Sequence, residues 1–233
     1  EEGGAGEGVG VLEVGAGIGV LTAELAKRAS KVVCVELDTR LLPVLDETLG
    51  EFDNVKIING DILKVDIHRI LEDEFGNMPV VVCANLPYYI TSPVIMRLLE
   101  SRLKIDSVTV MVQKEAAVRL CADVGSRDSG AVTVAVNYYA EAQKLFDVSR
   151  GSFMPSPNVD SSVIRLDILS EPPITVSDER FFFSMVKAAF SQRRKTASNG
   201  ISSGTGIAKP TVIKAIEAAG LPSTVRAEAL TME

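Results

Sequence analysis

The chain has 233 residues, a net charge of −7, 46% hydrophobic residues and a mean hydropathy of +0.22, which predicts one or two globular domains with a sizeable core. No apolar stretch approaches the roughly 18 residues that span a bilayer, and the first residues form no signal region, so we expect a cytoplasmic protein with no membrane partner. A single histidine, together with three cysteines that lack metal-type spacing, argues against histidine catalysis and a metal site.

Apolar runs alternate with segments of helical periodicity along most of the chain. Strands are predicted at residues 9–14, 31–35, 55–59, 80–84, 107–112, 142–148 and 162–168. Helices are predicted at residues 21–29, 39–49, 67–75, 93–103, 114–122, 178–191, 210–219 and 226–230. Residues 131–140 suit a helix or a strand by propensity, and we favour a helix that ends near Tyr138. Because strand–helix–strand units need parallel strands, we predict an α/β fold with five parallel strands and a terminal antiparallel hairpin.

The segment Glu171-Pro172-Pro173 breaks this pattern, and only helices are predicted after it. We therefore expect a catalytic domain at residues 1–170 and a small helical domain at residues 171–233.

A glycine-rich turn follows the first predicted strand. Gly15, Gly17 and Gly19 alternate with other residues, and Glu13 precedes them. Glycines at a strand-to-helix turn let backbone N–H groups approach a ligand closely. This spacing differs from the G-x-G-x-x-G of dinucleotide sites, and by itself it is also compatible with a simple turn.

Acidic side chains end the next two predicted strands. Glu36 is placed to accept hydrogen bonds from two ribose hydroxyls, and Asp61 to accept one from an adenine amine. Each alone is more often a solvated cap. Because the carboxyl ends of parallel strands share one edge, the residues together predict a nucleoside pocket.

The fourth predicted strand ends in Asn85-Leu86-Pro87-Tyr88. Pro87 fixes its own φ and favours an extended Leu86, so the Asn85 amide and the Leu86 carbonyl can point at one ligand atom. Tyr88 offers a flat face beside them. The alternative is a strand-end turn with a buried tyrosine.

Seven segments in this order carry a resemblance across nearly the whole chain: VLEVGAGIGVLT, VELD, NGD, NLPYYITSPV, QKEAAVRL, FMPSPNVDSSVIRL and AFSQRRKT. The chain resembles the ribosomal RNA adenine dimethyltransferase family of S-adenosylmethionine-dependent methyltransferases, specifically the small-subunit type. The resemblance implies a Rossmann-like methyltransferase fold and a small C-terminal helical domain.

The resemblance also implies S-adenosylmethionine as cofactor, S-adenosylhomocysteine as its product, and no metal. The residues implied to bind the cofactor are Glu13, Gly15, Ala16, Gly17, Gly19, Glu36, Leu37, Asp61, Ile62 and Asn85. The implied substrate is a pair of adjacent adenosines, dimethylated on N6, in a hairpin near the 3′ end of small-subunit (16S) rRNA. We expect the partner to be an assembling 30S particle and the protein to act as a monomer.

An adenine N6 amine is a poor nucleophile because its lone pair is delocalised into the ring. We hypothesise that the Asn85 side-chain oxygen and the Leu86 carbonyl accept the N6 hydrogens and align the amine for methyl transfer. Tyr88 would stack on the extruded base and Phe153 would cover its other face. For Phe153, packing of a proline-braced loop is the alternative.

The segment Arg193-Arg194-Lys195 is a local basic cluster. Residues 171–233 carry a net charge of +2, whereas residues 1–170 carry −9. Such a cluster is usually a solvated face, but at a domain junction we expect it to bind rRNA phosphates.

Two departures from the family and three alternatives remain. The family's N-terminal Gln-Asn-Phe-Leu segment and its further C-terminal helix have no counterpart here, so we expect a truncated chain. The alternatives are a large-subunit (23S) rRNA methyltransferase of the erythromycin-resistance type, a non-catalytic ribosome-assembly factor, and a dinucleotide oxidoreductase.

Overall fold

The computed structural model describes residues 2–192 and 194–232. The described chain divides into two compact units, one formed by residues 2–117 and 140–168 and the other by residues 118–139 and 169–232. Each unit has its own core and is described separately.

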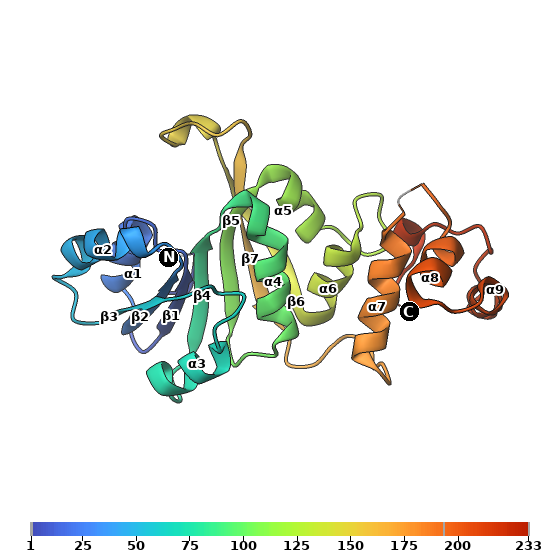
Figure 1. The fold of residues 1–233 in the computed structure, drawn as a ribbon, viewed down its shortest axis with the longest axis horizontal. Helices are drawn as coiled ribbons and strands as arrows, with labels where there is room; N and C mark the ends of the chain where they lie inside the picture. The colour runs from blue at the N-terminus through green and yellow to red at the C-terminus, as the bar shows by residue number, and fades with distance from the viewer. Residues whose placement is uncertain (1, 193, 233) are drawn as a thin grey trace. The chain divides into compact units, whose positions relative to one another are not determined.

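The first unit is built on a seven-stranded sheet with the order β3-β2-β1-β4-β5-β7-β6 (Figure 1). Its strands are β1 (Gly10–Val14), β2 (Lys31–Glu36), β3 (Val55–Asn59), β4 (Val80–Asn85), β5 (Ser107–Gln113), β6 (Ala140–Val148) and β7 (Ser161–Ile168). The first five strands are parallel, and β7 is antiparallel to both β5 and β6. The predicted sheet with its terminal hairpin is confirmed.

The central strands are apolar because both faces of a parallel sheet are covered. All five residues of β1 are buried, and Val11 pairs with Val32 and Val81 on the flanking strands. Helix α1 (Val20–Ala26) packs on one face through Leu25. The chain passes from β1 through β2 to β3 in one direction and then returns to β4 beside β1, which creates a switch point between β1 and β4. Open α/β sheets bind ligands at such points.

The remaining helical segments of this unit include those predicted near residues 39–49, 67–75, 93–103 and 114–122, together with two short 3-10 turns, η2 and η3, that were not predicted. They are η1 (Thr39–Leu41), α2 (Leu42–Leu49), α3 (Ile67–Phe75), η2 (Tyr88–Ile90), α4 (Thr91–Glu100) and η3 (Arg150–Ser152), with α5 (Lys114–Leu120) crossing into the second unit. Helix α4 begins two residues before Pro93, which was predicted to open it. A proline is tolerated in the first turn because its missing N–H has no partner there.

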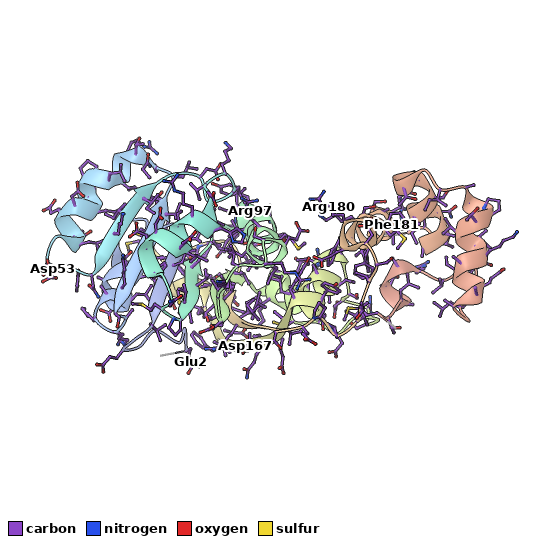
Figure 2. The ribbon with its side chains drawn as sticks, turned by 90° about the horizontal axis from the view of Figure 1, so that it is seen from below. Glu2, Asp53, Arg97, Asp167, Arg180 and Phe181 are labelled. Carbon is purple, nitrogen blue, oxygen red and sulfur yellow. The ribbon has the colours of Figure 1, made fainter. Side chains whose placement is uncertain are left out.

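The segment before β1 lies against the sheet. A guanidinium nitrogen of Arg165 donates to the Glu2 carbonyl at 3.0 Å, and Arg165 also pairs with Asp167 at 2.8 Å. Glu2 and Asp167, which both contact Arg165, are labelled in Figure 2. Glu2 is thereby held beside β7.

The second unit contains α6 (Ala131–Tyr139), α7 (Glu179–Phe190), α8 (Ala197–Thr205), α9 (Lys209–Ala218) and η4 (Ala227–Ala229). Tyr138 and Tyr139 of α6 pack against Phe182 and Phe183 of α7, with ring centroids 5.2 to 5.7 Å apart. The Tyr139 hydroxyl also donates to the Glu179 carboxylate. The compact units therefore differ from the expected division after residue 170, because α6 packs with the later helices.

Helix α8 was not predicted, because its sequence ASNGISSGT is rich in residues of low helix propensity. Its glycines allow close contact with α7. A Cβ atom at Gly200 would lie 2.6 Å from the Ala188 carbonyl oxygen, and one at Gly204 would lie 2.5 Å from the Ala188 Cβ. Tertiary packing thus stabilises a helix that local propensity disfavours. None of the helices in residues 2–192 and 194–232 has the length and apolarity needed to cross a bilayer.

Candidate functional site

A cavity of about 910 Å³ opens at the carboxyl ends of β1 to β4, at the switch point of the sheet. Nine of the ten residues predicted to bind the cofactor line it: Glu13, Gly15, Ala16, Gly17, Glu36, Leu37, Asp61, Ile62 and Asn85. Pro87 lines it as well. The strand ends are therefore brought together as expected, and the volume suits a ligand of nucleoside size with a small tail.

The turn after β1 needs glycine for its backbone. Gly15, Gly17 and Gly19 have φ values of 77°, 58° and 88°, in the left-handed region that other residues rarely adopt. Gly19 precedes α1 and does not line the cavity. A Cβ atom there would lie 2.9 Å from the Thr48 hydroxyl oxygen, so Gly19 lets α1 approach α2. Its contact with a cofactor stays a prediction.

The Glu36 carboxylate links two loops of the cavity. One oxygen accepts a hydrogen bond from the Gly17 N–H at 3.0 Å, and the other accepts one from the Asp38 N–H at 2.8 Å. The side chain is buried at the end of β2. Each carboxylate oxygen keeps a further lone pair, so Glu36 can accept two more hydrogen bonds from a ligand in the cavity.

Glu13 is a buried acid beneath the glycine loop. Its side chain is 1% exposed, and its Oε2 atom has no hydrogen-bond partner among the described residues. Burial raises the pKa of Glu13 to about 7, and the nearby Glu36 charge contributes to the increase. An unpartnered carboxyl oxygen at the wall of a cavity is a suitable site for a polar or cationic ligand group.

Asp61 follows β3 and also lines the cavity. Its carboxylate accepts a hydrogen bond from the Leu63 N–H at 3.0 Å, which lowers its pKa, and it pairs with Lys64 at 3.2 Å. Asp61 is therefore a charged acceptor at the cavity. The neighbouring Ile62 side chain is buried and adds apolar surface.

The Asn85–Tyr88 segment borders the cavity on the β4 side. Asn85 is exposed into it, whereas Leu86 is 2% exposed and packed in the core. Pro87 has φ −56° and ψ 134°, so its φ takes the value that the proline ring imposes. Tyr88 is half-buried, and its hydroxyl forms a 3.0 Å hydrogen bond with the Ser161 hydroxyl. Leu86 and Tyr88 do not line the cavity.

Phe153 lies in the connection between β6 and β7, after η3, where the hairpin extends beyond the sheet (Figure 1). Its side chain is half-buried and is not part of the cavity wall. The proposed stacking roles of Tyr88 and Phe153 stay predictions.

The cavity includes residues that sequence reasoning missed. They are Val14, Ile18, Val20, Leu21, Glu24, Val35, Asp38, Leu41, Gly60, Tyr89 and Ile90. The strongest available signal was the pair of tyrosines after Pro87, of which Tyr89 is 84% exposed. Ile18 and Val20 are exposed apolar residues at the glycine loop, and periodicity alone does not distinguish them from a helix face.

The predicted basic cluster lies between α7 and α8. Arg193 falls outside the described residues, and Arg194 and Lys195 are exposed. Their contact with RNA stays a prediction. Among residues 2–192 and 194–232, no group of three or more histidine, cysteine, aspartate or glutamate side chains is placed to hold a metal ion.

A mostly parallel seven-stranded sheet with a terminal antiparallel hairpin, a glycine loop after β1 and an acid ending β2 defines a Rossmann-like S-adenosylmethionine-dependent methyltransferase. The family model described as ribosomal RNA adenine dimethylase matches residues 5–224, and the chain belongs to this family. Its members are S-adenosylmethionine-dependent enzymes that dimethylate adenine in ribosomal RNA, and this chain is such an enzyme.

Relatives and solved structures agree with this assignment. The ribosomal RNA small subunit methyltransferases A of Lachnoclostridium phytofermentans and Geobacillus thermodenitrificans are each 48% identical over 96% of this chain and 78% of their own length. A dimethyladenosine transferase from Plasmodium falciparum has a TM-score of 0.74 at 26% identity, covering 95% of this chain and 85% of its own. The 23S rRNA methyltransferase ErmE has a TM-score of 0.69 at 28% identity, covering 98% and 88%.

Proposed function

We propose that this enzyme dimethylates N6 of two adjacent adenosines near the 3′ end of small-subunit rRNA, within an assembling 30S particle in the cytoplasm. The observation that carries the proposal is the 48% identity, over 96% of the chain, to relatives named as small-subunit methyltransferases. The proposal includes action as a monomer, without a metal and without a membrane.

The cavity residues fit S-adenosylmethionine, which supplies an electrophilic methyl group when bound. Glu36 accepts hydrogen bonds from the ribose hydroxyls through lone pairs that Gly17 and Asp38 leave free. Asp61 accepts a hydrogen bond from the adenine amine, and Glu13 provides a polar oxygen at the wall below the glycine loop. These side chains bind and orient, and none of them takes part in the bond changes.

The Asn85–Tyr88 segment handles the target base. The Asn85 side-chain oxygen and the Leu86 carbonyl accept the N6 hydrogens, which localises the lone pair and stabilises the positive charge that develops on the nitrogen. Asn85 is neutral and is not a general base, so the proton that N6 loses after methyl transfer passes to solvent. Tyr88 and Phe153 stack on the two faces of the extruded adenine, because a base in a helix cannot reach the cavity.

Methyl transfer to purified particles tests the proposal. We expect four methyl groups per 30S particle isolated from cells that lack this modification, and mass spectrometry of the rRNA should locate them as two adjacent dimethyladenosines. Methylation of 23S rRNA instead would support the large-subunit alternative, for which the structural likeness to ErmE is the motivating observation. Binding of NAD in place of S-adenosylhomocysteine would contradict both.

A further inference from the structure

Tyr88 is held by a hydroxyl group from a distant part of the chain. Its Oη atom lies 3.0 Å from the Oγ atom of Ser161, 73 residues away. Ser161 is 0% exposed, whereas the Tyr88 ring is half-buried. The buried Ser161 hydroxyl therefore binds one end of the side chain of a residue that is itself partly exposed.

The anchor itself is rigid. Ser161 is the first residue of β7, and it pairs with Gln113 of β5 on one side and with Val148 of β6 on the other. Because β7 is antiparallel to β5, Ser161 lies at the edge where the parallel strands end. In the sheet, β5 lies between β4 and β7, so the hydrogen bond from Ser161 to Tyr88 joins β7 to the loop after β4. The backbone that carries the Ser161 hydroxyl is therefore held by a neighbouring strand on each side.

Ser161 also ends the loop that carries Phe153. The base of this loop is closed by the Arg150 N–H, which donates to the Asp160 carboxylate at 3.0 Å, and by the Lys114 N–H, which donates to the Asp160 carbonyl at 3.0 Å. The Ser156 hydroxyl donates to the Arg150 carbonyl at 2.9 Å within the loop. The Tyr88–Ser161 bond therefore joins the two loops that present the two aromatic side chains.

We propose that Ser161 is a positioning residue for methyl transfer: its hydroxyl sets the orientation of the Tyr88 ring relative to the Phe153 loop, so that the slot for the extruded adenine exists before RNA binds. This role rests on the proposed function of Tyr88. Pre-organisation of this kind improves catalysis because the ring need not be ordered when the base arrives. If the Ser161 hydroxyl served only as a hydrogen-bond partner for the Tyr88 hydroxyl, it would stabilise the fold without affecting methylation of the adenine.

A double-mutant cycle separates these roles. Ser161→Ala and Tyr88→Phe each remove one end of the bond and keep the tyrosine-sized ring, so each should lower kcat/KM for 30S particles by roughly two- to tenfold. The double variant should be no slower than the slower single variant. Binding of S-adenosylhomocysteine should be unchanged in all three, because neither side chain lines the cofactor cavity. Multiplicative losses in kcat/KM would overturn the proposal.

Ser162→Ala is the matched control. Ser162 is also 0% exposed and belongs to the same strand, but its hydroxyl donates to the Asp147 carboxylate at 2.7 Å. Its effect on kcat/KM should combine multiplicatively with that of Tyr88→Phe. Thermal unfolding of every variant shows whether it is folded, and Ser161→Thr, which keeps the hydroxyl, should retain activity closer to wild type than Ser161→Ala.

A readout independent of activity uses the small number of tyrosines. The chain has four, so ¹³C labelling of tyrosine gives a simple NMR spectrum in which Tyr88→Phe identifies the Tyr88 signal. This signal should shift in Ser161→Ala and stay in place in Ser162→Ala, and an unshifted signal in Ser161→Ala would refute the anchoring. If Ser161→Ala shifts the Tyr88 signal but the wild-type protein does not methylate 30S particles, the anchoring holds and the proposed function is contradicted.

Discussion

Glu13 combines an ionisable group with a location that excludes water. Glu13 is the fourth residue of the fully buried strand β1, and its Oε2 atom finds no partner among the described residues. A charge there is poorly solvated, which is the main reason for the pKa of about 7. The free energy of unfolding should therefore depend on pH through this residue.

Glu13→Gln should remove that dependence in the ligand-free protein. The folded-state pKa of about 7 lies above the ordinary value of 4.5, so the stability that Glu13 contributes is fully present below 4.5 and is lost as pH rises toward 7. Relative to wild type, the variant should gain up to about 3 kcal/mol between pH 4.5 and pH 8. Urea unfolding at both pH values measures this, and an equal difference at the two would contradict the assignment.

Phe153→Ala should impair methylation far more than folding. Stacking of a base on an aromatic ring contributes roughly 1 to 3 kcal/mol, so kcat/KM should fall about fivefold to more than a hundredfold. The half-buried ring lies on a loop beyond the sheet, so the melting temperature should change little. Phe181→Ala is a suitable control, because this phenylalanine is 44% exposed at the start of α7 (Figure 2) and should leave kcat/KM within about twofold. Equal losses in the two variants would contradict base stacking.

At the scale of elements, the contact between α7 and α8 depends on the absence of side chains. Gly200→Ala places a methyl group 2.6 Å from the Ala188 carbonyl oxygen and 2.8 Å from that of Ala189. Since backbone cannot yield as a flexible side chain does, we expect a loss of about 1 to 3 kcal/mol in the free energy of unfolding. Chemical denaturation followed by circular dichroism measures this loss.

Ser203→Ala makes the opposite change in the same helix. Ser203 is exposed on α8, and alanine has the higher helix propensity, so the variant should be stabilised by a few tenths of a kcal/mol. Both substitutions create an alanine, and they differ only in what the new methyl group meets. A Gly200→Ala protein as stable as wild type would show that the two helices are not so closely packed.

Elements with local sequence signals were predictable, whereas elements that depend on contacts with distant residues were not. Val55–Asn59 and Ile67–Phe75 are predicted to the residue, because an apolar run bounded by turn residues and an amphipathic segment after Asp66 are local signals. Helix α8 is stabilised by its contact with α7. This contact cannot be inferred from the residues of α8 alone. The placement of α6 with the later helices has the same cause, since its partners Phe182 and Phe183 lie over 40 residues away.

The residues of the candidate site also differ in whether the sequence alone identifies them. Glycines and acids at strand ends are recognisable because parallel strands place their carboxyl ends together, so the cavity was predicted from Gly15, Glu36 and Asp61. The bond between Tyr88 and Ser161 depends on the position of β7 beside β5, which residue spacing does not contain. Apolar cavity residues such as Ile18 carry no chemical signal of their own.

At the scale of the whole molecule, the net charge and the local basic cluster have opposite effects on RNA binding. A net charge of −7 repels phosphate at long range, so affinity must come from local cations that meet the backbone. Residues 171–233 carry a net +2 and contain the basic cluster at 193–195, of which Arg194 and Lys195 are exposed. A loss of affinity on removing three cations is ambiguous, because it also makes the whole protein more negative.

The salt dependence of binding resolves this ambiguity. If all three residues of the basic cluster contact phosphates, replacing them with alanine should reduce the slope of log K against log salt concentration by about 2 to 3, since each contact releases somewhat less than one counterion. The triple variant Lys27→Ala, Arg28→Ala, Arg69→Ala changes the net charge equally, from −7 to −10, but removes exposed cations that already pair with Glu24 and Asp73. Its slope should stay near that of wild type. Filter binding of 30S particles from 50 to 300 mM salt compares the three proteins, and equal slopes in both triple variants would mean that net charge, not phosphate contact, sets the affinity.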